Sequence, residues 1–322
     1  MNHLLQYKTK QFFFVLIKVS IVVGAFYFIF SRLTSNTNLN FSDFISVVKQ
    51  NNALSLKSVF ILTLLTSFNW GFEILKWQLL VSTFKKISFK EALEQSLGSL
   101  TASIFTPNRI GEYGAKAIYF VTDYRKKVLL VNFLGNVTQM LVTTVFGLIG
   151  LSVLLINYEL PVNYYNISIV AVSVLILALI IIILTKKTNF SIKGFSIEKL
   201  KRFVINFPKR ILSLVLGLSI LRYLVFSFQF HLLLLFFNIE LSYFTAMVFI
   251  TSMYLLSSII PSIFIFDVVV KGSVSLYLFS LLHINAFTIL SVTTLMWFFN
   301  FVLPSVFGSY YVLNFNLPKK TV

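Results

Sequence analysis

Six long apolar runs constrain the fold of this 322-residue chain more than any other feature. Each is close to, or longer than, the roughly 20 residues with which a helix crosses the hydrocarbon core of a bilayer. Charged residues make up only 11% of the chain, whereas a soluble domain carries about 25%. The pattern predicts an all-α protein, a polytopic helical bundle integral to a membrane. The expected spans are 12–30, 57–84, 128–157, 164–185, 211–236 and 285–313.

The basic residues predict the orientation of these spans. Segments 85–127 and 186–210 carry eight lysines and arginines each, and the connections 158–163 and 237–241 carry none. Because cytoplasmic segments are enriched in basic residues, both basic segments and both chain termini are expected in the cytoplasm. The formal charge of +17 is therefore interpreted as a topology signal beside an anionic leaflet, and no nucleic-acid partner is expected. The first apolar run lacks a cleavage site and is expected to remain as a helix.

Two polar segments interrupt the apolar sequence, and both have the same plan. In each, a proline is followed five or six residues later by an acid, and four residues after that by a lysine. The two sets are Pro107, Glu112 and Lys116, and Pro261, Asp267 and Lys271. An acid and a base at i,i+4 share one helix face, where each offsets the desolvation of the other.

The two segments occupy corresponding places in a predicted internal repeat. Repeat unit one (57–157) and repeat unit two (210–313) each hold a long helix, a broken region and a second long helix. The first helix of each also contains a base followed by an aromatic residue. These pairs are Lys76-Trp77 and Arg222-Tyr223. Because a single crossing, 164–185, lies between the units, the repeats are expected to be inverted, which is typical of secondary transporters.

The remaining chain divides into connecting parts. Segment 1–56 is expected to be an N-terminal transmembrane helix with its connection, 158–209 a linking helix with a basic loop, and 314–322 a cytoplasmic tail. The broken regions 88–122 and 242–281 are either re-entrant hairpins or pairs of short crossings, and both options leave the topology unchanged.

Arg109 is the first candidate for binding a substrate. It lies between Pro107, where the preceding helix must stop, and Gly111, where a backbone can approach a ligand closely. A guanidinium suits bidentate binding of phosphate, although Arg109 could instead anchor the hairpin to lipid phosphates. The predicted headgroup-binding residues are Arg109, Glu112, Lys116, Asp267 and Lys271, with Pro107, Gly111, Lys76, Arg222, Asn136 and Pro261 as cavity or supporting residues. The alternative for Asp267 with Lys271 is a structural ion pair.

Several polar residues within the spans have structural interpretations. Lys76, three residues after Glu73, is expected to reach the cytoplasmic interface along its helix. Arg222 lies deep in its helix and needs a partner inside the bundle. Gln229 and His231 are expected to form interhelical hydrogen bonds. A polar stripe that either lines a cavity or packs between helices is formed by Asn132, Asn136 and Gln139.

Features of a catalytic protein are missing from the sequence. It has no cysteine and no P-loop, and its three histidines are far apart. The longest segment outside the spans, 186–210, is too short for a catalytic domain. We therefore expect no enzyme activity, no catalytic residue, no metal site and no cofactor.

The motifs resemble one known family. Pro107-Asn108-Arg109-Ile110-Gly111-Glu112 followed by Lys116 is similar to the P-G-R-x-G-E motif of the flippase-like transmembrane domain of lysylphosphatidylglycerol synthases. Lys76-Trp77-Gln78-Leu79-Leu80 resembles that family's R-W-x-L-L, and Leu303-Pro304-Ser305-Val306-Phe307-Gly308 resembles its terminal motif. The second proline motif departs from the family pattern, since it lacks glycines and carries Asp267 where the family has glutamate.

The resemblance implies a stand-alone member without the aminoacyltransferase domain, located in the bacterial inner membrane. The expected function is that of a lipid flippase or transporter that moves an anionic phospholipid or a polyprenyl-phosphate-linked lipid. The alternative is a non-transporting membrane partner of a lipid- or glycan-modifying enzyme, docked through segment 186–210.

Overall fold

The computed structural model describes residues 23, 55–104, 106, 110–158, 191–192, 195–260 and 267–318. Two predicted spans, 12–30 and 164–185, lie outside this range except for Val23. Three candidate site residues also lie outside the described range: Pro107, Arg109 and Pro261.

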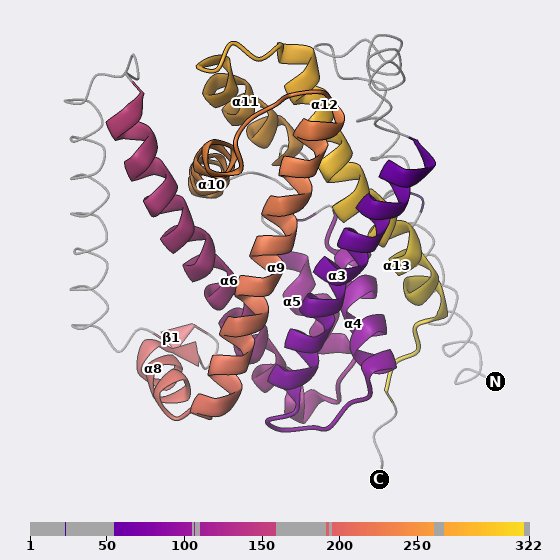
Figure 1. The fold of residues 1–322 in the computed structure, drawn as a ribbon. Coiled ribbons are helices and arrows are strands. Elements are labelled where there is room, and N and C mark those ends of the chain that lie inside the picture. Colours follow the sequence, from indigo (N-terminus) through magenta and orange to yellow (C-terminus); the bar gives the residue numbers. More distant parts are fainter. Residues whose placement is uncertain are drawn as a thin grey trace.

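Both predicted units contain helices in the order long, short, short, long (Figure 1). Unit one comprises α3 (Leu56–Val81), α4 (Phe89–Ala102), α5 (Ile110–Ile118) and α6 (Thr122–Asn157). Unit two comprises α9 (Lys209–Phe236), α10 (Tyr243–Ile259), α11 (Asp267–Ser280) and the continuous helix formed by α12 (Ala286–Trp297), the π-helical turn η2 (Phe298–Val302) and α13 (Leu303–Asn314). The four predicted long helices and both interrupted regions are therefore present.

Four described helices are long and apolar enough to cross a membrane: 56–81, 122–157, 209–236 and 286–314. The four short helices have between 9 and 17 residues, fewer than the roughly 20 of a full crossing. Helix α6 begins at Thr122 rather than at the predicted residue 128, and it includes Asp123 in its first turn. An acidic residue there is favourable because the N-terminus of a helix carries a partial positive charge.

Local side chains fix where two of the short helices begin. The Ser88 hydroxyl accepts a hydrogen bond from the Glu91 backbone, while the Glu91 carboxylate accepts one from the Ser88 backbone, which forms a capping box at the start of α4. Ser242 caps α10 through the backbone of Thr245. These caps satisfy backbone donors that a helix leaves free at its N-terminus.

The long helices pack across the two units. Helix α3 lies along α9, the short helix α4 packs on α13, and the short helix α10 packs on α6. Each unit therefore covers a short helix of the other unit. In Figure 1, α4 and α5 lie in the lower half of the bundle, whereas α10 and α11 lie in the upper half.

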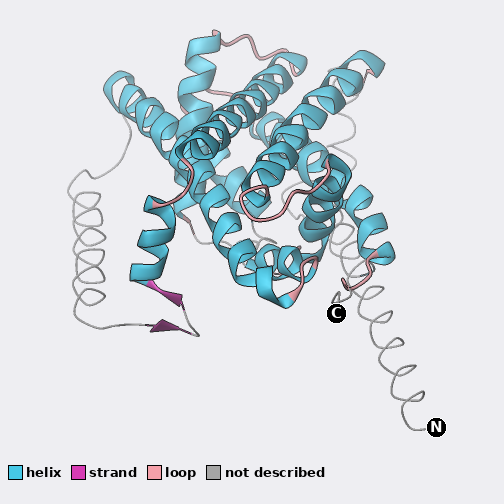
Figure 2. Cartoon of the chain, turned by 90° about the horizontal axis from the view of Figure 1, so that it is seen from below, coloured by secondary structure: helices cyan, strands magenta, loops and turns pink. Residues whose placement is uncertain are grey.

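The described part of the basic segment between the units lies at the lower end of the bundle in Figure 1. It comprises the antiparallel strand pair β1 (Ser191–Ile192) and β2 (Phe195–Ser196) and the helix α8 (Ile197–Ile205). These elements lie at the edge of the long helices (Figures 1 and 2). The end of α3 lies at the same end of the molecule (Figure 1), where it leads to the basic residues Lys85 and Lys86.

Glycines allow the closest helix contacts. A Cβ atom at Gly308 would lie 2.2 Å from the Leu97 carbonyl oxygen on α4, and one at Gly147 would lie 2.4 Å from the Leu255 side chain on α10. Small residues at such positions let helix backbones approach closely in membranes. Gly308, the last residue of the terminal motif, therefore holds α13 against α4.

Candidate functional site

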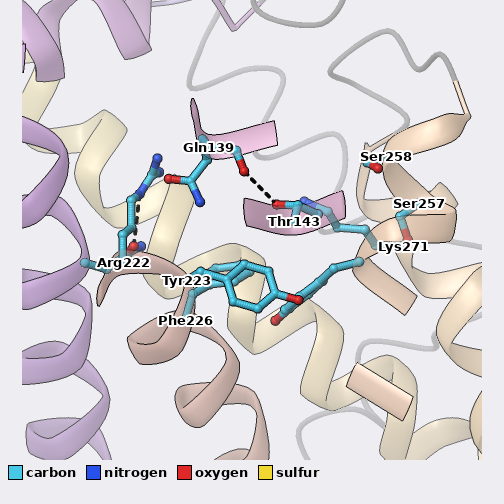
Figure 3. A pocket seen from close by; sticks show the side chains of 10 residues that line it. Gln139, Thr143, Arg222, Tyr223, Phe226, Ser257, Ser258 and Lys271 are labelled. Atoms are coloured by element: carbon cyan, nitrogen blue, oxygen red, sulfur yellow. Dashed lines mark hydrogen bonds between the residues drawn. The ribbon is translucent and has the colours of Figure 1, made fainter. Parts of the chain in front are cut away.

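A cavity of about 290 Å³ lies between helices of unit one and unit two (Figure 3). Helices α3 and α6 contribute walls from unit one, and α9, α10 and α11 contribute walls from unit two. Its lining residues are Asn69, Gln139, Thr143, Arg222, Tyr223, Phe226, Tyr254, Ser257, Ser258 and Lys271. Two of them carry positive charge, and none of these described lining residues is acidic.

Arg222 is the best-defined charged residue of the cavity. Its Nη1 atom is 2.6 Å from Glu73 Oε2, and its Nε atom donates to Asn69 Oδ1 at 3.1 Å. The second terminal nitrogen, Nη2, has no hydrogen-bond partner among the described residues. The Arg222 side chain is 20% exposed, more than its partner Glu73 at 10%. The guanidinium is thus held on two sides and keeps donors for a ligand in the cavity.

Lys271 approaches the cavity from the opposite side. It belongs to α11, and in Figure 3 its side chain extends toward Thr143 on α6, while Arg222 enters from α9. The rings of Tyr223 and Phe226 lie along the wall between the two cations (Figure 3). A negatively charged group in the cavity would therefore have a cation from each of two helices of unit two.

Glu73 and Lys76 form a buried ion pair that contacts Arg222 through the Glu73 carboxylate. Lys76 Nζ lies 2.6 Å from Glu73 Oε2, the oxygen that also contacts Arg222. The prediction that Lys76 reaches the cytoplasmic interface is wrong, since its side chain is 3% exposed. A carboxylate one helical turn away holds the ammonium inside the bundle, where the attraction between opposite charges offsets their desolvation.

Glu112 and Lys116 form the predicted i,i+4 pair at 2.7 Å, but they do not line the cavity. Lys116 Nζ also donates to Asn132 Oδ1 at 2.9 Å and lies 4.2 Å from the centre of the Trp77 ring. Carboxylate, amide and aromatic face together surround the buried ammonium. In this conformation the pair links α5 to α3 and α6, and a role of Glu112 and Lys116 in headgroup binding stays a prediction.

The charges of the ion-paired side chains in this region do not balance. Three cations, Arg222, Lys76 and Lys116, accompany two carboxylates, Glu73 and Glu112, so this group of described side chains carries one excess positive charge. Charge within a membrane is costly unless it is paired. Among the three cations, only Arg222 lines the cavity, which is where a compensating anion would bind.

A chain of amide side chains extends from Arg222 across the bundle. Asn69 Nδ2 donates to Asn300 Oδ1 at 2.8 Å, and Asn300 Nδ2 donates to Gln229 Oε1 at 2.8 Å. Gln229 in turn donates to Thr66 Oγ1 at 3.0 Å, which confirms its predicted interhelical role. Asn300 lies in η2, and π-helical turns occur frequently at functional sites. The amide chain fixes α3, α9 and η2 relative to one another.

Sequence reasoning missed Asn69 and Asn300. Both lie within apolar spans, and a lone asparagine in such a position is a signal for a polar contact between helices. Their sequence separation of 231 residues explains why pairing them required the structure. Tyr254 was also missed. It is 7% exposed, and its buried hydroxyl has no hydrogen-bond partner among the described residues.

The other predicted residues have separate positions. Asn136 donates to the Tyr113 hydroxyl at 2.9 Å, so it supports α5 rather than the cavity. Gly111 provides a close contact, because a Cβ atom there would lie 2.7 Å from Thr106 Cγ2. Asp267 begins α11, but its side chain lies outside the described residues. His231 does not use Nδ1 for the expected hydrogen bond within the described structure, and its ring instead contacts that of Tyr243.

The fold and the site define a polytopic helical membrane protein with a polar, cation-bearing cavity between its two halves. Residues 15–308 match the family model described as the lysylphosphatidylglycerol synthase TM region, and the chain belongs to that family. No curated protein and no solved structure matches the chain.

Proposed function

We propose that this protein is a lipid flippase or transporter that binds an anionic headgroup in the cavity between Arg222 and Lys271. The observation that carries the proposal is the excess positive charge of this ion-pair group, of which only Arg222, itself partly exposed, lines the cavity. A guanidinium with free donors suits a phosphate group, because it forms charge-assisted hydrogen bonds in a planar geometry. Phospholipids and polyprenyl-phosphate-linked lipids both supply such a group.

The absence of acidic residues from the described lining favours a headgroup with net negative charge. An aminoacylated headgroup would place an ammonium beside Arg222 and Lys271, with no carboxylate of the described lining to receive it. Like charges in a site of low dielectric repel strongly. The neutral hydroxyl and amide groups of the lining, including Ser257 and Gln139, suit the hydroxyl groups of a glycerol or sugar headgroup.

We further propose that the two units are inverted repeats and that α4 with α5 and α10 with α11 are re-entrant elements. Their shared helix order, their reciprocal packing and the position of these pairs in opposite halves of the bundle support this arrangement. Movement of one unit against the other would then open the cavity to each leaflet in turn, as in other inverted-repeat transporters. We also propose that both termini lie in the cytoplasm and that the protein lies in the bacterial inner membrane; the basic segments 85–127 and 186–210 support this orientation.

Reconstitution of the purified protein into vesicles tests the proposed function. Fluorescent phosphatidylglycerol, a fluorescent polyprenyl phosphate and a fluorescent aminoacylated phosphatidylglycerol are each incorporated, and a membrane-impermeant quencher reports which leaflet holds the label. We expect faster translocation of at least one anionic lipid than in protein-free vesicles, and little or no acceleration for the cationic lipid.

The same experiment separates the proposed function from the alternative. A non-transporting partner of a lipid- or glycan-modifying enzyme would leave every lipid at the protein-free rate. Equal acceleration of anionic and cationic lipids would contradict recognition by the Arg222–Lys271 cavity.

A further inference from the structure

We propose that Glu73 is an internal counter-anion that competes with the lipid headgroup for Arg222, and so sets both the affinity for the headgroup and its release. This inference rests on the proposed function. It concerns a residue that does not line the cavity and whose only described cation contacts are Arg222 and Lys76.

The contacts of one carboxylate oxygen suggest the exchange. Glu73 Oε2 lies 2.6 Å from Arg222 Nη1 and 2.6 Å from Lys76 Nζ. When a phosphate binds Arg222 from the cavity side, Glu73 can give up one cation and keep the other. The carboxylate is therefore never left without a positive partner, which would be costly in a buried position.

Asn69 holds the guanidinium in place during such an exchange. Its Oδ1 atom accepts from Arg222 Nε, and its own amide is fixed by Asn300. The loss of the Glu73 contact would therefore free Nη1 without releasing the whole side chain. Together with Nη2, this nitrogen offers the two donors that a phosphate accepts in a bidentate geometry.

A competing carboxylate would meet the requirement that a transport site release its substrate. A site must bind its substrate well enough to be occupied and weakly enough to release it on the other side. Arg222 without an internal competitor would hold a phosphate firmly. The Glu73 carboxylate repels the bound headgroup and forms its ion pair with Arg222 again as the headgroup leaves. Both effects favour release.

The test measures binding and translocation in a Glu73→Gln variant. Short-chain dihexanoyl-phosphatidylglycerol is titrated into detergent-solubilised protein by calorimetry, and vesicle translocation of long-chain phosphatidylglycerol is measured in parallel. We expect the Kd to fall by about tenfold, equal to about 1.4 kcal/mol, because coupling between close charges is commonly of this size or larger. The maximal translocation rate is expected to fall while half-saturation occurs at lower lipid content.

The control is Glu198→Gln on α8. It makes the same chemical change at an exposed carboxylate, which pairs with Arg202 rather than Arg222. We expect a much smaller change in Kd for this control. The comparison separates the effect of removing one negative charge from the effect of freeing Arg222 from Glu73.

A double variant, Glu73→Gln with Lys76→Met, removes one buried charge of each sign. The double variant preserves the net charge and does not leave Lys76 without its carboxylate partner. It can therefore be used for the binding measurement if the single variant fails to fold. Tighter binding in the double variant supports the competitor role.

Two further outcomes are distinct. An unchanged or weaker affinity in folded Glu73 variants, together with wild-type binding and transport, overturns the role of Glu73 alone. The absence of lipid binding and transport in the wild-type protein contradicts the proposed function itself.

Discussion

Replacing Arg222 with glutamine is expected to reduce the translocation of anionic lipids at least about tenfold, because removing one partner of a buried charge pair costs about 2–5 kcal/mol. Glutamine keeps a polar amide near the cavity but removes the positive charge and the paired donors. Glu73 retains Lys76 as a partner, so the variant does not leave an isolated buried carboxylate. The effect should appear in transport and binding rather than as a loss of folded protein.

The control for this variant is Arg202→Gln on α8. Arg202 is an exposed residue that pairs with Glu198, and exposed pairs contribute little to stability. Translocation is measured in vesicles for the wild type and both variants, with size-exclusion chromatography as the check on folding. Wild-type rates in a folded Arg222→Gln protein would remove this arginine from the mechanism.

Gly308→Ala is expected to cause a large loss of stability for a single added methyl group. The new Cβ atom would lie 2.2 Å from the Leu97 carbonyl oxygen and 2.3 Å from Thr101 Oγ1. Because a backbone carbonyl cannot turn aside as a flexible side chain can, α13 and α4 must separate. Overpacking of this kind costs typically about 1–3 kcal/mol, and the loss is measured as a lower thermal unfolding temperature in detergent.

Gly217→Ala on α9 supplies the comparison. A Cβ atom at Gly217 meets no atom within 4 Å, so alanine should leave stability unchanged or increase it through its higher helix propensity. Equal unfolding temperatures for the two alanine variants would show that the α4–α13 contact does not depend on the missing side chain.

The local parts of this structure could be predicted from the sequence. Apolar runs predicted the four long helices that the structure describes, and the i,i+4 spacing predicted the ion pair between Glu112 and Lys116. The need of Arg222 for a partner followed from its depth within a span. These features depend on residues close together in the chain, where helix geometry fixes which side chains meet.

The composition of the site could not be predicted in the same way. Glu73 could pair with Lys76 on its own helix, but its contact with Arg222 joins α3 to α9. The Asn69–Asn300 bond likewise depends on how the two units pack. The prediction for Lys76 was wrong because the position of its helix in the bundle buries both Lys76 and Glu73, and this position does not follow from their spacing. Side-chain contacts over such separations follow from tertiary packing, which a single sequence pattern does not specify.

The most direct test of headgroup binding is a structure of the protein in nanodiscs containing an anionic lipid that it translocates. Density for a lipid phosphate is expected in the cavity, within hydrogen-bonding distance of the Arg222 guanidinium and on the side that faces Lys271. Lipid density confined to the outer surface of the helices, in a preparation that transports the same lipid, would contradict a headgroup path through this cavity.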